Sequence, residues 1–461
     1  MLIHCLTKIL SCSVVVFSAG FGGLQSVANA QVDINEPELT MPDLTMPDVP
    51  EAEVLPTEDA KPADGPRVGA FNVILPLPGQ TEMSSILQGM AKRFGENVQT
   101  YPKRITKELE AANADPALVP TEPPTTTTTD TSEKPMAYAK YSFYVPADYK
   151  PGKPYGLIAF INAGEGSGGV TSYREALDKQ HMIFVGAHNV GNKNDTVWRF
   201  LLTLEAVRNA KEMYDIDDDR VYVSGFSGGG RASSIMAMTM PDVFTGGFHF
   251  SGVNYFRNVP SEGGKFWSGY SPKLDQKVFN TSRQRSRFVL QTGSKDSNLK
   301  NTKEVYDAFK VDRFNVLYLE VPDHGHAMPP ADAFATGVAF LDAPIFSKAS
   351  ELYKQAQASE KKKKFGEAYV AYARATVRGS DQPFAKEAAA SAEKLQAMYT
   401  NAVQETRALI DAGDFVKATA AMNQLKLTFA PIADKQAAAF KEEITAAVKK
   451  SPKKTPAVKP Q

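Results

Sequence analysis

One pentapeptide constrains the fold of this chain more than any other feature. Gly-Phe-Ser-Gly-Gly at 225–229 fits the pattern G-x-S-x-G, and the apolar run 221–223 leads directly into it. Residues 231–240, which follow, are predicted to form a helix. A serine on such a strand-to-helix turn is held with its hydroxyl exposed above a sheet. A glycine-rich connector with an incidental serine is the alternative, but it seldom follows a strand. The spacing therefore predicts that Ser227 is a nucleophile.

Strand-like and helix-like segments alternate on both sides of this turn. The apolar runs rich in Val, Ile, Phe and Tyr are 141–145, 157–161, 182–185, 221–223, 244–250, 288–290 and 316–321. Helices are predicted between them, most clearly at 196–214 and more briefly at 302–309. This alternation is typical of a mostly parallel sheet flanked by helices. Together with the serine turn, it predicts an α/β-hydrolase fold over residues 138–345.

A serine hydroxyl needs a base, and the base in this fold follows the last strand. The run 316–321 is followed by two histidines, His324 and His326. We choose His326 because a glycine before it and Pro329 after it suit a tight loop that turns an imidazole back over the sheet. His324 is then a supporting or exposed residue.

The third catalytic group is expected after the preceding strand. Asp296 follows the run 288–290 and occupies the place of a carboxylate that orients the histidine. Asp312 and Asp323 are competitors, but they lie next to the last strand rather than after the preceding one. The predicted order Ser227, Asp296, His326 is the order of this fold.

Two backbone N–H groups should hold the oxyanion of such a reaction. One is expected from Gly228, directly after the nucleophile. The other is expected from the glycine-rich loop 162–169, with Ala163 or Gly164 as the donor. A phosphate cradle is the alternative for this loop, but the lysine of a G-x-x-x-x-G-K-[ST] motif is missing.

Composition divides the chain into further segments. Residues 1–30 predict a cleaved signal peptide that ends in Ala-Asn-Ala, and both cysteines lie within it. The mature chain would be periplasmic or secreted, free of thiols and without a membrane span. The remaining predicted segments are an acidic Pro-rich segment at 31–66, an extension and Thr/Pro linker at 67–137, a helical module at 346–450 and a basic tail at 451–461.

The helical module contains a short internal repeat. Phe-Gly-Glu-Ala at 365–368 is similar to Phe-Val-Lys-Ala at 415–418, which indicates a repeated helix pair of tetratricopeptide type. From residue 346 to the end the chain carries twenty basic and twelve acidic side chains, against one basic and ten acidic in 31–66. An anionic surface or a protein partner could bind this basic module, although a solvated helical domain explains the charge as well.

Two stretches resemble one family. Tyr-Asp-Ile-Asp-Asp-Asp-Arg-Val-Tyr-Val at 214–223, with the serine turn after it, is similar to secreted polyhydroxybutyrate-depolymerase-like and feruloyl or acetylxylan esterases. Gly-His-Ala-Met-Pro at 325–329 resembles the segment around that family's catalytic histidine. Many members have a histidine and glycine in the oxyanion loop, where this chain reads Asn-Ala-Gly-Glu at 162–165. The resemblance implies a carboxylic-ester hydrolase for acylated sugars, aryl esters or polyesters.

The sequence therefore predicts a serine ester hydrolase that needs no metal and no organic cofactor. A net charge of zero gives no reason to expect a nucleic acid partner. Phe256, Trp267 and Tyr270 are candidates for a substrate wall, since flat rings suit a sugar or aryl face, but simple packing explains them equally well. A peptidase of the same fold and a binding or scaffold protein that works through the helical module are the alternative functions.

Overall fold

The computed structural model of the protein describes residues 66–120, 133–270 and 274–450. The predicted signal peptide, the acidic segment up to residue 65, the threonine run at 125–129 and the basic tail lie outside the described residues.

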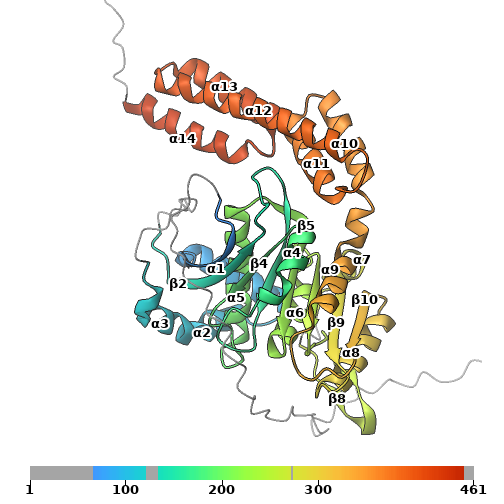
Figure 1. The fold of residues 1–461 in the computed structure, drawn as a ribbon. Coiled ribbons are helices and arrows are strands. Elements are labelled where there is room, and N and C mark those ends of the chain that lie inside the picture. The colour runs from blue at the N-terminus through green and yellow to red at the C-terminus, as the bar shows by residue number, and fades with distance from the viewer. Residues whose placement is uncertain (1–65, 121–132, 271–273, 451–461) are drawn as a thin grey trace, which may run out of the picture. The chain divides into compact units, whose positions relative to one another are not determined.

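The strands form one large sheet and one small ribbon (Figure 1). The strands are β1 (Gly69–Pro76), β2 (Tyr138–Val145), β3 (Tyr155–Ile161), β4 (Met182–Ala187), β5 (Ile216–Phe226), β6 (Gly246–Phe250), β7 (Val259–Pro260), β8 (Phe266–Trp267), β9 (Arg287–Gly293) and β10 (Asn315–Val321). The large sheet has the order β1-β2-β4-β3-β5-β6-β9-β10, and β7 pairs with β8. β2 is antiparallel to both β1 and β4, and all other pairs in the large sheet are parallel. The predicted mostly parallel sheet is confirmed.

Helices cover both faces of this sheet, and further helices follow the last strand in the C-terminal part of the chain. They are α1 (Gln80–Phe94), α2 (Tyr101–Arg104), α3 (Thr106–Ala114), α4 (Arg174–Lys179), α5 (Thr196–Met213), α6 (Gly228–Thr239), α7 (Gln276–Arg285), α8 (Leu299–Val311), α9 (Ala331–Phe346), α10 (Ala349–Lys361), α11 (Phe365–Arg378), α12 (Ala385–Asp411), α13 (Phe415–Phe429) and α14 (Asp434–Lys450). Within the described ranges, no helix combines the length and the apolar character that a membrane crossing requires.

Alternation along β3 shows how the core is built. Leu157, Ala159 and Ile161 are buried in the cluster that contains residues of α1, α5, α6 and α8. Ile158 and Phe160 point the other way, into the cluster that contains residues of α4 and α9. A strand between two helical layers buries both of its faces, which explains why its sequence is a continuous apolar run.

The C-terminal helices pack into two successive cores. α10, α11 and α12 share one cluster, and α12, α13 and α14 share the next. The short internal repeat lies in the first turns of α11 and α13, and its two alanines, Ala368 and Ala418, are fully buried. The repeated residues therefore occupy the same packing position in consecutive helix pairs.

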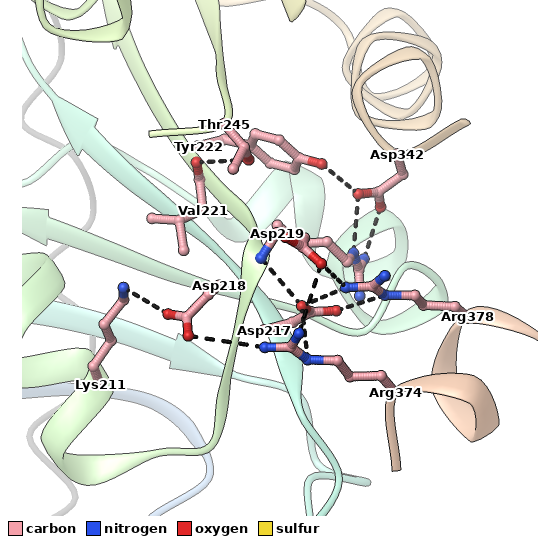
Figure 2. A network of polar contacts seen from close by, with 11 residues as sticks. Lys211, Asp217, Asp218, Asp219, Val221, Tyr222, Thr245, Asp342, Arg374 and Arg378 are labelled. Atoms are coloured by element: carbon pink, nitrogen blue, oxygen red, sulfur yellow. Dashed lines mark hydrogen bonds and ion pairs between the residues drawn. The ribbon is translucent and has the colours of Figure 1, made fainter. Parts of the chain in front are cut away.

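An ion-pair network joins α11 to the start of β5 (Figure 2). Arg378 donates from Nε and Nη2 to the two carboxylate oxygens of Asp217, at 2.8 and 2.6 Å, and from Nη2 to Asp219 at 2.9 Å. Arg374 lies within 3.4–3.8 Å of Asp217, Asp218 and Asp219. The side chains of Arg378 and Asp217 are 4% and 1% exposed, so these two buried charges need the partners that the network supplies.

A second buried pair follows directly along β5. Arg220 donates from Nε and Nη2 to the carboxylate of Asp342 on α9, at 2.9 and 2.7 Å, and the Tyr222 hydroxyl donates to the same carboxylate at 2.7 Å. Two C-terminal helices therefore neutralise consecutive charges at the start of one strand.

We expect Arg378→Ala to lower the free energy of unfolding by about 3 kcal/mol, because the buried Asp217 carboxylate loses both of its short hydrogen bonds and keeps only Arg374, 3.4 Å away, to offset its charge. Arg407→Ala is the matched control. It breaks a largely exposed pair with Glu443 and should change stability by no more than about 1 kcal/mol. Urea unfolding of the whole chain measures both values, and equal effects of the two substitutions would contradict a stabilising role for the buried pair.

Candidate active site

Ser227 lies on a sharp turn between the end of β5 and the start of α6. Its backbone angles are φ 55° and ψ −118°, a conformation that an L-residue other than glycine rarely adopts. The turn is closed tightly. A Cβ at Gly225 would stand 2.4 Å from the backbone of Gly229, and one at Gly229 would stand 2.0 Å from the carbonyl oxygen of Ile161. The small residues of the pentapeptide are therefore required by close backbone approach.

Three predicted side chains meet in a row above this turn. The His326 Nε2 lies 2.9 Å from the Ser227 Oγ, and its Nδ1 lies 2.9 Å from the Asp296 Oδ1. Ser227 follows β5, Asp296 follows β9 and His326 follows β10, so the row spans the same end of the parallel strands β5, β6, β9 and β10. In this arrangement the imidazole can accept the serine proton while the carboxylate stabilises the imidazolium that forms.

Asp296 is fixed by hydrogen bonds besides that of the imidazole. Its Oδ1 accepts from the Asn298 N–H at 2.8 Å, and its Oδ2 accepts from the Thr292 hydroxyl at 3.1 Å. Burial by itself would raise the pKa of Asp296, but the hydrogen bonds from His326 and Asn298 outweigh it and hold the pKa below its ordinary value. Asp296 is therefore an anion at neutral pH.

The competing residues point elsewhere. The His324 Nε2 contacts the Met328 carbonyl oxygen at 3.0 Å, so this ring does not face Ser227. Asp323 is exposed and pairs with Lys295, and Asp312 accepts hydrogen bonds from Tyr255 and Arg257. Only the chosen histidine and aspartate join the serine.

The predicted oxyanion donors lie at the same end of the sheet. Gly228 is the first residue of α6, so its N–H has no acceptor within the helix and lies at the positive end of the helix dipole. The Ala163 N–H, in contrast, donates to the Oδ1 of Asn162 at 2.9 Å, and the Nδ2 of Asn162 donates to the Gly166 carbonyl at 3.0 Å. One of the two predicted loop donors is thus already engaged. Gly164 remains a prediction.

The loop after β3 is braced by Arg199 of α5. Its Nη2 donates to the Asn162 carbonyl oxygen at 3.1 Å, and its Nε donates to the Val190 carbonyl at 2.7 Å. Burial lowers the pKa of Arg199 to about 10. Arg199, Asn298 and Thr292 were not predicted, because nothing in a sequence shows which distant loop or side chain such polar groups contact.

The three aromatic residues of the predicted substrate wall take part in packing. Tyr270 contacts the rings of Phe94 and Phe200, with centroids 5.4 and 5.9 Å apart. Phe256 packs against Tyr255 and Phe279, and the Trp267 Nε1 donates to the Glu304 carboxylate. All three are partly buried against the main core. The packing explanation accounts for these rings, and their role in substrate binding stays a prediction.

No family model matches this chain, and no curated protein matches it. Solved structures do align with it. A fluorophosphonate-binding serine hydrolase of Staphylococcus aureus shares 14% identity over 44% of this chain and 92% of its own, with a TM-score of 0.35. A ferulic acid esterase from Anaeromyces mucronatus shares 16% identity over 45% of this chain and 85% of its own, with a TM-score of 0.34. A thermophilic esterase from Thermogutta terrifontis shares 17% identity over 48% of this chain and 91% of its own, with a TM-score of 0.32.

The chain has the α/β-hydrolase fold. The strand order, the serine turn after β5 and the chain order Ser227, Asp296, His326 all agree with it. Among the residues that the structure describes, no group of three or more His, Cys, Asp or Glu side chains is placed to hold a metal ion. The chemistry available to this α/β-hydrolase site from its own side chains is acyl transfer through the serine.

We expect Asp296→Asn to lower kcat by about 10³–10⁴-fold, because the amide can neither fix the imidazole tautomer nor stabilise the imidazolium. The carboxylate is charged above its ordinary pKa of 3.8, and its lowered pKa widens that range toward acid. The loss should therefore be present throughout the range from about pH 6 to about pH 9. Initial rates across this range measure it, with the exposed Asp323→Asn as control. An Asp296→Asn variant whose kcat returns to the wild-type value at pH 9 would show that Asp296 is not the orienting group.

Proposed function

We propose that this protein is a serine hydrolase that cleaves carboxylic esters through an acyl-enzyme. The observation that carries the proposal is the row of Ser227, His326 and Asp296, with both contacts at 2.9 Å. Each residue in the row has one role, and no further group is needed to move the proton.

Acylation begins at the serine oxygen. The Ser227 Oγ attacks the ester carbonyl carbon while His326 Nε2 takes the hydroxyl proton, and the carbonyl oxygen becomes an oxyanion near the Gly228 N–H. The intermediate collapses when the bond to the alcohol breaks and His326 returns the proton to the leaving oxygen. The products of this half-reaction are the free alcohol and an ester of Ser227.

Deacylation repeats these steps with water. His326 takes a proton from the water as it attacks the acyl carbon, and the same proton then restores the Ser227 hydroxyl when the acid departs. The enzyme returns to its starting state, so the cycle consumes one ester and one water.

The substrate class follows from the sequence resemblance to feruloyl, acetylxylan and polyhydroxybutyrate-cleaving esterases. We propose acylated carbohydrates, aryl esters or polyesters as substrates. The predicted signal peptide supports a periplasmic or secreted enzyme, where such esters are met outside the cytoplasm. The partner of the helical module stays a prediction.

A fluorophosphonate probe tests the nucleophile directly, because it reacts with a serine that a neighbouring base activates. We expect stoichiometric labelling of the purified protein, none in Ser227→Ala, and full labelling in Ser172→Ala, which removes an exposed serine from the short 3-10 helix Thr171–Tyr173. A folded wild type that does not label would overturn the proposed function.

Substrate panels then separate the two kinds of hydrolase. We expect release of acid from aryl acetates, aryl butyrates and methyl ferulate, and no comparable cleavage of peptide anilides. Cleavage of the anilides at similar rates would favour a peptidase of the same fold.

A further inference from the structure

The carboxamide of Asn192 lies directly against the residue that follows the nucleophile. A Cβ built on Gly228 would stand 2.0 Å from the Asn192 Oδ1 and 2.8 Å from its Nδ2. The amide therefore occupies the space that a side chain at position 228 would fill. It therefore lies beside Gly228, whose N–H has no acceptor within α6.

The position of Asn192 is fixed by its backbone. Its N–H donates to the Ala163 carbonyl oxygen at 2.8 Å, which ties the segment after β4 to the loop after β3. A Cβ at the neighbouring Gly191 would stand 2.1 Å from the Glu165 Oε1, so the two loops are in close contact there as well. The Asn192 side chain therefore projects from an anchored point rather than from a free loop.

The Asn192 carboxamide itself is uncommitted, in contrast to its neighbours. Asn162 uses both ends of its amide, and Asn194 donates from Nδ2 to Glu165 at 2.9 Å. Over the ranges described, no side-chain hydrogen bond is made by Asn192, and the residue is exposed. Its terminal amide can turn about its last bond and present Nδ2 where Oδ1 now lies, because no hydrogen bond opposes the rotation.

The site can use a donor of this kind. The Ala163 N–H, predicted to be the second oxyanion donor, is already given to Asn162. The Gly228 N–H and the predicted Gly164 N–H remain, and an amide beside Gly228 would add a side-chain donor to the developing negative charge.

We propose that Asn192 is a catalytic residue whose Nδ2 donates a hydrogen bond to the oxyanion, beside the N–H of Gly228. This inference rests on the proposed serine-hydrolase function and names the group that completes its oxyanion hole. The amide stabilises the tetrahedral intermediate but makes no hydrogen bond in the free enzyme, so its removal should affect the reaction and leave folding unchanged.

The test compares Asn192→Ala and Asn192→Asp with the wild type on phenyl acetate. We expect Asn192→Ala to lower kcat by about 10²–10³-fold, with KM within about twofold, because the lost bond forms only in the transition state. Asn192→Asp has nearly the same shape but replaces the donor by an anion that repels the oxyanion, so its loss should be larger. Lys193→Ala, at the exposed neighbouring residue, should keep wild-type rates.

An aryl trifluoromethyl ketone gives an independent measurement, since its adduct with the serine carries the oxyanion. Its inhibition constant should rise in Asn192→Ala by the same factor by which kcat/KM falls. Thermal unfolding midpoints equal to that of the wild type show that both variants fold, and the isosteric aspartate keeps the test valid if the alanine variant does not.

Two results would overturn the inference while leaving the proposed function intact. In both, the wild type labels with the fluorophosphonate and hydrolyses the ester. In the first, kcat of the Asn192 variants equals that of the wild type, and in the second, only their KM rises. A wild type that neither labels with the fluorophosphonate nor hydrolyses the ester would overturn both.

Discussion

Ser227 keeps its unusual backbone because the chain around it is too closely packed to relax. A backbone of this kind costs about 1–3 kcal/mol and persists only where the surroundings impose it. Ile161 at the end of β3 lies against Gly229, and a Cβ at Gly252 would stand 2.3 Å from the Ser227 carbonyl oxygen. The Ser227 N–H is also held by the Phe250 carbonyl at 2.8 Å. Three strand ends thus converge on one residue, and this convergence directs the hydroxyl at His326.

β5 connects this turn to the C-terminal helices. Its first residues carry Asp217, Asp219 and Arg220, and its last residue precedes Ser227. Buried charges at the start of a central strand would be costly without partners, and Arg378 and Asp342 supply them. At about 3.3 Å per residue, the strand separates these ion pairs from the nucleophile by roughly 30 Å. The charged end anchors the helices, and the apolar end supports the chemistry.

Much of the fold was predictable, and the errors have physical causes. The prediction for β5 began at Val221, whereas the strand begins at Ile216, because three consecutive aspartates are poor strand formers in isolation. α6 begins at Gly228 rather than Arg231, because glycines hide a helix start from propensity. For Phe256, Trp267 and Tyr270, composition could not separate a binding surface from packing, since both use the same rings.

The sequence by itself determined the local turn and the order of the reactive residues along the chain. A strand followed by Gly-Phe-Ser-Gly-Gly has few ways to fold. The segments that follow the last two strands of the sheet offered few candidates for the orienting carboxylate and the base. Only the tertiary structure decided which side chains meet across the sheet. Arg378 reaches Asp217, and Asn192 reaches Gly228, because tertiary packing brings together segments that lie far apart in the chain. Periodicity and spacing report neighbours along one element, whereas these contacts depend on how separate elements pack.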